Sequence, residues 1–219
     1  MFDPLSTLFP ATLTYQLQRD PWVADTLSGM SNVTSVILAG GRAERMGRDK
    51  ALVEFRGRPM IAHVAAALRS ASMDVVVVGR ESVRGEEHVV PDVDGLGGGP
   101  AVGLATAFRH VADDDLFVVA VDQPLLRPET IQGLLACPGS AVVPVADGHP
   151  QVTCALYRRA CHQPLESALA AGKSTLRRRL GSVETTLVGR DIWSDWGADG
   201  RSWLSLDTPE AVRRAEALL

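Results

Sequence analysis

The stretch from Val36 to Lys50 constrains the fold more than any other part of this chain, and it reads V-I-L-A-G-G-R-A-E-R-M-G-R-D-K. An apolar strand runs into the pair Gly40 and Gly41 and then into a loop rich in arginine, which Lys50 closes. Because the two glycines lack side chains, an anion can approach the backbone N–H groups. This pattern is typical of the carboxyl end of a strand in an open parallel sheet, where ligands bind. It predicts a site for a polyphosphate.

Two better-known phosphate loops do not match this stretch. The dinucleotide-binding fingerprint requires G-x-G-x-x-G, and the glycines here have a different spacing. The P-loop requires G-K-[ST], whereas Gly47 is followed by R-D-K. Arg45 and Lys50 are the candidates to balance the negative charge of a departing pyrophosphate. We therefore expect a loop that binds a nucleoside triphosphate and belongs to neither of these two motifs.

Charge and composition restrict the class of ligand. The net charge of -4 argues against a general nucleic-acid binder, which would be basic overall, so the basic loop points to a small anionic ligand. No apolar run approaches the ~20 residues of a membrane span, and the first residues do not resemble a secretory signal. We expect a cytoplasmic protein with no membrane partner. Cys137, Cys154 and Cys161 form no C-x-x-C pair, which favours free thiols in a reducing compartment.

From residue 33 onward, predicted strands alternate with predicted helices. This alternation indicates the α/β class: a mainly parallel central sheet between two layers of helices. The expected strands cover 33–39, 74–79, 88–90, 116–121, 141–144, 152–156 and 183–188, with a strand-like segment at 203–206. The expected helices cover 58–69, 101–111, 128–135, 160–170 and 208–218.

Residues 1–32 differ from the rest, and we interpret them as an N-terminal extension of unknown role that precedes a domain at 33–219. Leucines and a phenylalanine in this segment, Leu13 and Leu17 among them, could share one face of a short helix, which Pro10 interrupts.

Asp122 directly follows the apolar run V-V-A-V, so it is expected at the carboxyl end of a central strand. A carboxylate at that place, beside a polyphosphate site, could hold Mg²⁺. Capping of the following helix is the alternative, but Asp122 lies several residues before that helix.

Asp207 is a second candidate metal ligand. Alternation along Ser205-Leu206-Asp207 places the two polar residues on one face and the leucine on the other. Thr208 and Pro209 read as the N-cap and first position of a helix, so Asp207 could serve the start of that helix instead, and the two roles are compatible.

A resemblance to a known family rests on five blocks of sequence in one order. These are L-A-G-G-R-A-E-R-M-G-R-D-K-A-L, G-R-P-M-I-A-H-V, P-D-V-D-G-L-G-G-G-P-A-V-G-L, A-V-D-Q-P-L-L and L-D-T-P-E. In these blocks the chain resembles the molybdenum cofactor guanylyltransferases from about Val33 to its C-terminus. The resemblance implies a Rossmann-like three-layer nucleotidyltransferase fold. It also implies joining of GMP from GTP to the phosphate of molybdopterin with release of pyrophosphate.

The same resemblance implies roles for individual residues and partners. Asp122 would hold Mg²⁺, and GTP and molybdopterin would be the substrates. Molybdoenzymes or cofactor chaperones would be transient protein partners. The residues that would contact the nucleotide are Leu38, Ala39 and Gly40, with Lys50 at its phosphates and Asp92 at its nucleoside.

The chain departs from the family at two places. The family commonly has Asp-Thr-Pro where this chain has Asp122-Gln123-Pro124, and it often has Asn-x-Asn-Thr-Pro-Glu where this chain has S-L-D-T-P-E. The second ending looks more like the related cytidylyltransferases, whereas the pair Gly40-Gly41 resembles the guanylyl enzymes. An acidic side chain at the base, for which Asp92 is the candidate, favours guanine because guanine offers two donors. We favour GTP. The alternatives are CTP, a sugar phosphate as acceptor, and a non-catalytic nucleotide-sensing domain.

Overall fold

The computed structural model of the chain describes residues 12–14, 32–40, 49–86, 88–92, 98–111, 115–172, 176 and 183–219. The strands are β1 (Thr12–Thr14), β2 (Val33–Leu38), β3 (Glu54–Phe55), β4 (Arg58–Pro59), β5 (Val75–Val78), β6 (Val89–Val90), β7 (Asp115–Ala120), β8 (Ala141–Ala146), β9 (His149–Pro150), β10 (Cys154–Tyr157) and β11 (Thr185–Val188). The α-helices are α1 (Met60–Ser70), α2 (Pro100–His110), α3 (Pro128–Ala136), α4 (His162–Ala170), α6 (Arg190–Trp193) and α7 (Pro209–Ala217). Short 3-10 helices are η3 (Lys50–Leu52), η4 (Arg159–Cys161), η5 (Ser194–Trp196) and η6 (Arg201–Trp203).

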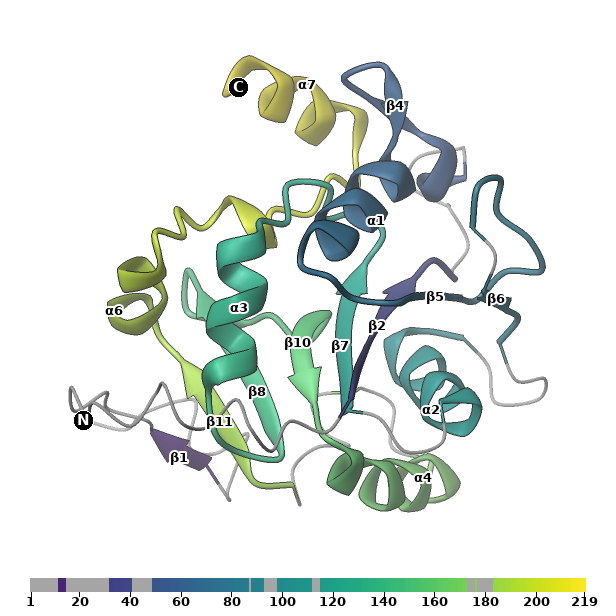
Figure 1. Cartoon of the computed structure of the whole chain (residues 1–219), viewed down its shortest axis with the longest axis vertical. Coiled ribbons are helices and arrows are strands. Elements are labelled where there is room, and N and C mark those ends of the chain that lie inside the picture. Colours follow the sequence, from purple (N-terminus) through teal and green to yellow (C-terminus); the bar gives the residue numbers. More distant parts are fainter. Residues whose placement is uncertain are drawn as a thin grey trace.

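In the part of the chain that the structure describes, nine strands form one sheet with helices on both sides (Figure 1). The strand order is β1-β11-β8-β10-β7-β2-β5-β6, and β9 pairs with β8 off this path. Strand β10 is antiparallel to β7 and β8, and β9 is antiparallel to β8, whereas every other neighbouring pair is parallel. The prediction of an α/β fold with a mainly parallel central sheet is confirmed.

Both faces of the sheet are buried, as the continuous apolar runs of the strands predict. On one face, Ile37, Val77 and Phe117 belong to a core cluster that also contains apolar residues of α1, α3 and α6. On the other face, Val36 and Leu116 belong to a cluster with apolar residues of α2 and α4. Alternate residues of β2 thus enter opposite cores, which holds this strand and the loop after it in a fixed position.

A smaller third core attaches the C-terminal helix to the domain. Phe55 and Met60 pack with Leu206 and with Val212 of α7. Thr208 is the N-cap of this helix, because its side-chain oxygen accepts a hydrogen bond from the backbone N–H of Ala211 at 3.1 Å, and proline occupies the first helical position. The predicted helix start is confirmed. The segment before α7 is thereby fixed across the end of β7.

Most predicted elements agree with the structure to within about two residues at each end. The helix expected from residue 58 begins two residues later, at Met60. Pro59 has an extended backbone (φ -56°, ψ 142°), and it pairs with Glu54 in the β3–β4 hairpin. The backbone therefore turns helical only after this proline.

The predicted strand-like segment at 203–206 is wrong. A 3-10 helix ends at Trp203, and residues 204–207 have no regular structure. The backbone N–H of Leu206 donates to the carbonyl of Asp122 at 2.7 Å. This bond fixes the segment without a strand ladder.

The N-terminal extension contributes to the sheet. Residues Thr12–Thr14 form β1, which pairs in parallel with β11 at one edge, so the expected helix is wrong at these three positions. The other residues of that predicted helical face, including Leu17, lie outside the described residues. Within the described ranges, no helix has both the length and the apolar character to cross a membrane.

Candidate active site

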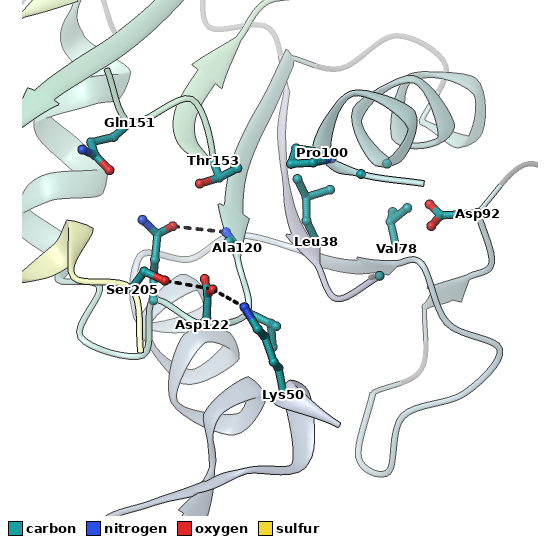
Figure 2. Close-up of a pocket in the computed structure, with 15 residues that line it drawn as sticks. Leu38, Lys50, Val78, Asp92, Pro100, Ala120, Asp122, Gln151, Thr153 and Ser205 are labelled. Atoms are coloured by element: carbon teal, nitrogen blue, oxygen red, sulfur yellow. Dashed lines mark hydrogen bonds and ion pairs between the residues drawn. The ribbon is translucent and has the colours of Figure 1, made fainter. Parts of the chain in front are cut away.

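A pocket opens at the carboxyl ends of β2, β5 and β7, the edge of the sheet at which the sequence predicts a ligand. Its cavity has a volume of about 270 Å³. Figure 2 shows three regions along it: Asp92 with apolar side chains at one end, Lys50 and Asp122 in the middle, and Gln151, Thr153 and Ser205 at the other end. Three different chemical environments thus lie in one cavity.

Asp122 lies in the middle of the pocket and accepts two hydrogen bonds on one oxygen. The ammonium of Lys50 lies 3.0 Å from Oδ2 of Asp122, and the hydroxyl of Ser205 donates to the same oxygen at 3.0 Å (Figure 2). These residues are 72 and 83 positions away from Asp122 in the sequence. The side chain of Asp122 is only 13% exposed, and that of Lys50 is 30% exposed. Both charges are therefore partly withdrawn from water and screened less than a surface pair.

Lys50 owes its position to a second ion pair. Asp49 is the N-cap of η3 and accepts a hydrogen bond from Ala51 N–H at 3.1 Å. The guanidinium of Arg80 binds both carboxylate oxygens of Asp49, and its Nε donates to the carbonyl of Ala39 at 3.1 Å. Arg80 thus connects the end of β2 to the residue that precedes Lys50. Sequence reasoning missed Arg80; its position directly after the strand end Val78-Gly79 was the available signal.

Two glycines and a carboxylate meet at one end of the pocket. A Cβ on Gly40 would lie 2.7 Å from Oδ2 of Asp92 and 3.1 Å from Cα of Gly79. Gly79 has a φ of +95°, and a Cβ there would lie 2.4 Å from Cα of Gly40. Only glycine fits these two positions without a shift of the backbone. Sequence analysis predicted Gly40 at the nucleotide and missed Gly79, because the contact joins two different strands.

Asp92 has the environment of a ligand-binding carboxylate. Burial raises the pKa of its carboxyl group. Its Oδ1 is buried and has no hydrogen-bond partner among the described residues. Leu38 and Val78 line the same end of the pocket, and a Cβ on Gly103 of α2 would lie 2.8 Å from Cδ2 of Leu38. Apolar walls and an unpaired acceptor fit a flat ring that carries N–H donors.

At the opposite end of the pocket, the described residues that line the wall are polar and uncharged. Gln123, Gln151, Thr153 and Ser205 line this end. Gln123 is only 2% exposed, which is unusual for an amide side chain. Sequence analysis recorded Gln123 only as a departure from a family pattern and assigned it no role.

The predicted site residues have three outcomes. Those that line the pocket together are Leu38, Gly40, Lys50, Asp92 and Asp122. Ala39 is 4% exposed and is not a lining residue, although its carbonyl accepts the bond from Arg80. Gly41 and Arg45 lie outside the described residues. Asp207 is not among the residues that line this pocket, so its role as second metal ligand stays a prediction.

The described residues fit Mg²⁺ better than a metal with an all-protein ligand set. They contain no group of three or more histidine, cysteine, aspartate or glutamate side chains that could hold an ion. Asp122 offers one carboxylate in the pocket, and its hydrogen bonds from Lys50 and Ser205 both go to Oδ2. Mg²⁺ is commonly bound by one or two carboxylates and completed by substrate phosphates and water. The donor set at Asp122 is compatible with that mode.

Comparisons with known proteins point to a family of nucleotidyltransferases. The family described as "MobA-like NTP transferase domain" matches residues 35–185. A Bacillus licheniformis protein named as a probable molybdenum cofactor guanylyltransferase is 32% identical over 173 residues, which cover 72% of this chain and 87% of the relative. A Pseudomonas putida molybdenum cofactor guanylyltransferase is 35% identical over 153 residues, which cover 66% of this chain and 80% of the relative.

Among solved structures, the fold is similar to that of molybdopterin-guanine dinucleotide biosynthesis protein A from Archaeoglobus fulgidus. The TM-score is 0.73 at 24% identity, and the match covers 84% of this chain and 97% of the other. This likeness concerns the fold, and it confirms the expected nucleotidyltransferase architecture.

Proposed function

Because this chain belongs to the MobA-like NTP transferase domain family, we propose that it joins GMP from GTP to the phosphate of molybdenum-carrying molybdopterin and releases pyrophosphate. The relatives named above support this choice of substrates, since both carry the name molybdenum cofactor guanylyltransferase. The single observation that carries the proposal is the contact of Lys50 with Asp122 in the middle of the pocket.

Nucleotidyl transfer asks for alignment and charge neutralisation more than for covalent chemistry by the protein. The attacking group is a phosphate oxygen of the acceptor, the bond from the α-phosphorus to the β-phosphate oxygen breaks, and pyrophosphate leaves. In this proposal, Lys50 would leave Asp122 and bind the phosphates of a bound triphosphate. We assign Arg45 and the N–H groups near Gly41 to the same phosphates, from their place in the sequence.

Asp122 is the residue that would hold Mg²⁺. The bound ion would neutralise charge on the α-phosphate and on the attacking phosphate. Ser205 and the backbone bond from Leu206 to the Asp122 carbonyl restrict the orientation of this carboxylate before any ligand arrives. Asp207 remains our proposal for a further carboxylate near the ion.

Asp92 supports GTP rather than CTP. Its unpaired Oδ1 and neighbouring Oδ2 can accept from N1–H and from the exocyclic amino group of guanine. Cytosine presents an acceptor at the corresponding ring nitrogen, so one carboxylate oxygen would face a like acceptor and lose its bond.

The test is product formation by the purified full chain. We would incubate it with Mg²⁺, molybdopterin and each of GTP, CTP, ATP and UTP, and measure pyrophosphate together with the mass of the dinucleotide. The proposal predicts molybdopterin guanine dinucleotide from GTP at a rate well above that from CTP. Preference for CTP would change the nucleotide assignment. Turnover only with a sugar phosphate would change the acceptor, and binding of GTP without turnover on any acceptor would favour a sensing domain.

A further inference from the structure

The amide side chains at the uncharged polar end of the pocket have no role in the machinery described so far. This end lies on the other side of Lys50 and Asp122 from Asp92, and Figure 2 shows Gln151, Thr153 and Ser205 around it. Gln123 also lines this end and is almost fully buried. Buried amides cost free energy unless their donors and acceptors find partners. In each of the two amides, one half is already hydrogen-bonded to the backbone.

The oxygen of the Gln123 amide is turned toward the protein. Its Oε1 lies 3.3 Å from the backbone N–H of Ala120, which also donates to the carbonyl of Thr153 at 2.7 Å. A backbone N–H is a donor, and the oxygen is the only acceptor of a side-chain amide. This contact therefore fixes which way the amide of Gln123 points. The nitrogen Nε2 of Gln123 is left as a donor without a hydrogen-bond partner among the described residues. A donor on a 2% exposed side chain is thus available at a pocket wall.

Gln151 is bonded to the backbone through the other half of its amide. Its Nε2 donates to the carbonyl of His149 at 2.9 Å, so the amide nitrogen is the half that is used. Its backbone is held on both sides, because Gln151 N–H donates to Pro144 and its carbonyl accepts from Cys154 N–H. The oxygen Oε1 of Gln151 remains as an acceptor at the pocket without a hydrogen-bond partner among the described residues. Gln123 and Gln151 therefore offer one free donor and one free acceptor.

We propose that Gln123 and Gln151 bind the ring of the acceptor substrate through its lactam edge, the adjacent C=O and N–H of an oxo-heterocycle. The Gln123 donor would bind the ring carbonyl, and the Gln151 acceptor would bind the ring N–H. The inference rests on the proposed function, which makes the acceptor a pterin. Guanine and pterin both carry a lactam edge, so we assign guanine to the Asp92 end from the role proposed for Asp92, and the acceptor ring to the amide end.

The structure also explains why this end favours a ring over a sugar. Each free amide atom belongs to a side chain whose other half is tied to the backbone, so neither amide can rotate freely to follow hydroxyl groups. A site built on fixed hydrogen bonds rejects a ligand that leaves them unmade. Gln123 would then be the residue through which this chain selects its acceptor.

Three variants test the proposal. In Gln123→Glu, one carboxylate oxygen still faces Ala120 N–H, and the other replaces the donor by an acceptor. Gln151→Leu removes the acceptor and adds no charge, so it controls for the charge that Gln123→Glu brings near Asp122. Gln132→Glu on the exposed surface of α3 is the matched control for the same chemical change away from the pocket.

The measurements are KM and kcat for molybdopterin and for GTP, the Kd of GTP, and the binding of a phosphorylated 2-amino-4-oxopteridine followed by its fluorescence. We expect KM for molybdopterin and Kd for the pteridine to rise ~10–100-fold in Gln123→Glu and Gln151→Leu, as an unpaired buried partner predicts. KM for GTP should stay within about twofold in Gln151→Leu, and Gln132→Glu should match the unaltered protein.

Three results would overturn the inference. The first is an unchanged pteridine Kd in both pocket variants, and the second is a rise of the GTP Kd in Gln151→Leu as large as that for the acceptor. Absence of pteridine binding by the unaltered chain would also overturn it. Failure of the proposed function looks different: the unaltered chain would bind GTP and transfer GMP to a sugar phosphate and not to molybdopterin.

Discussion

Replacement of Gly79 by alanine tests whether the contact between the ends of β2 and β5 shapes the nucleotide end of the pocket. Gly79 has a φ of +95°, and an added Cβ would lie 2.4 Å from Cα and 2.5 Å from N of Gly40. Both of these atoms are backbone, so neither can rotate away. The left-handed conformation costs an alanine about 1–2 kcal/mol, and an overlap in a packed region costs a further ~1–3 kcal/mol. Gly79→Ala should therefore lower the free energy of unfolding by about 2–5 kcal/mol.

Gly85→Ala is the matched control for this variant. Gly85 has a similar φ of +87°, and a Cβ there would meet no atom within 4 Å. Gly85→Ala should therefore lower the free energy of unfolding only by the cost of the left-handed backbone conformation, about 1–2 kcal/mol. Urea or thermal unfolding measures both values, and a chain of this size should lose ~2–4 °C in Tm for each kcal/mol.

The two variants should also differ in function. Gly40 lines the pocket, and its Cα would have to move away from the new side chain. Calorimetric titration should show weaker GTP binding in Gly79→Ala and unchanged binding in Gly85→Ala. Equal stability losses in the two variants, with unchanged GTP affinity in both, would refute the close contact as a determinant of the site.

Three further predictions concern other parts of the molecule. Ser205→Ala removes the hydroxyl that donates to Asp122 at 3.0 Å and should lower kcat about 3–10-fold without loss of stability; unchanged kcat would show that the bond does not orient the carboxylate. Gly133→Ala should lower the free energy of unfolding by ~1–3 kcal/mol, because the added Cβ would lie 2.1 Å from the indole of Trp196. A higher free energy of unfolding in a urea titration would mean that the greater helix propensity of alanine outweighs this clash. The three buried cysteines should react with a thiol reagent at pH 8 only after unfolding, since burial raises the pKa of Cys137 to about 11 and those of the other two to about 12; rapid reaction of the native protein would contradict this. Because burial raises these pKa values, the thiols lose their protons at a lower pH in the unfolded chain than in the folded protein. The free energy of unfolding should therefore fall as the pH rises above about 9.

The sequence predicts the layers of this fold and the edge of the sheet at which the pocket opens well, because these depend on local pattern. The four valines of β5 and the run before Asp122 indicate strands buried on both faces, and the structure confirms both. Thr208 and Pro209 mark the start of α7 by their own chemistry. Lys50 and Asp122 could be predicted as members of one site, because Lys50 closes the loop that follows β2 and Asp122 follows the end of the neighbouring parallel strand β7.

The features that sequence reasoning missed depend on contacts between distant segments. Gly79 matters only because Gly40 lies against it, and Arg80 matters only because Asp49 and Ala39 lie within its reach. The segment at 203–206 has the alternation of a strand, but no neighbouring strand pairs with it in the described part of the chain. Residues 12–14 pair with β11 although their apolar spacing suggested a helix. In each case the partner, and not the local pattern, decides the outcome.

The most direct test of the central claim is the comparison of Asp122→Asn with the unaltered chain in a single assay. The variant keeps the size of the side chain and removes the negative charge that lies 3.0 Å from Lys50 and that would hold Mg²⁺. The measurement is the rate of dinucleotide formation at saturating GTP, molybdopterin and Mg²⁺, together with the Kd of GTP. We predict a fall in kcat of roughly 10³-fold with a nearly unchanged GTP affinity. Full turnover in Asp122→Asn would show that this carboxylate does not take part in the transfer, and the proposed active site would be wrong.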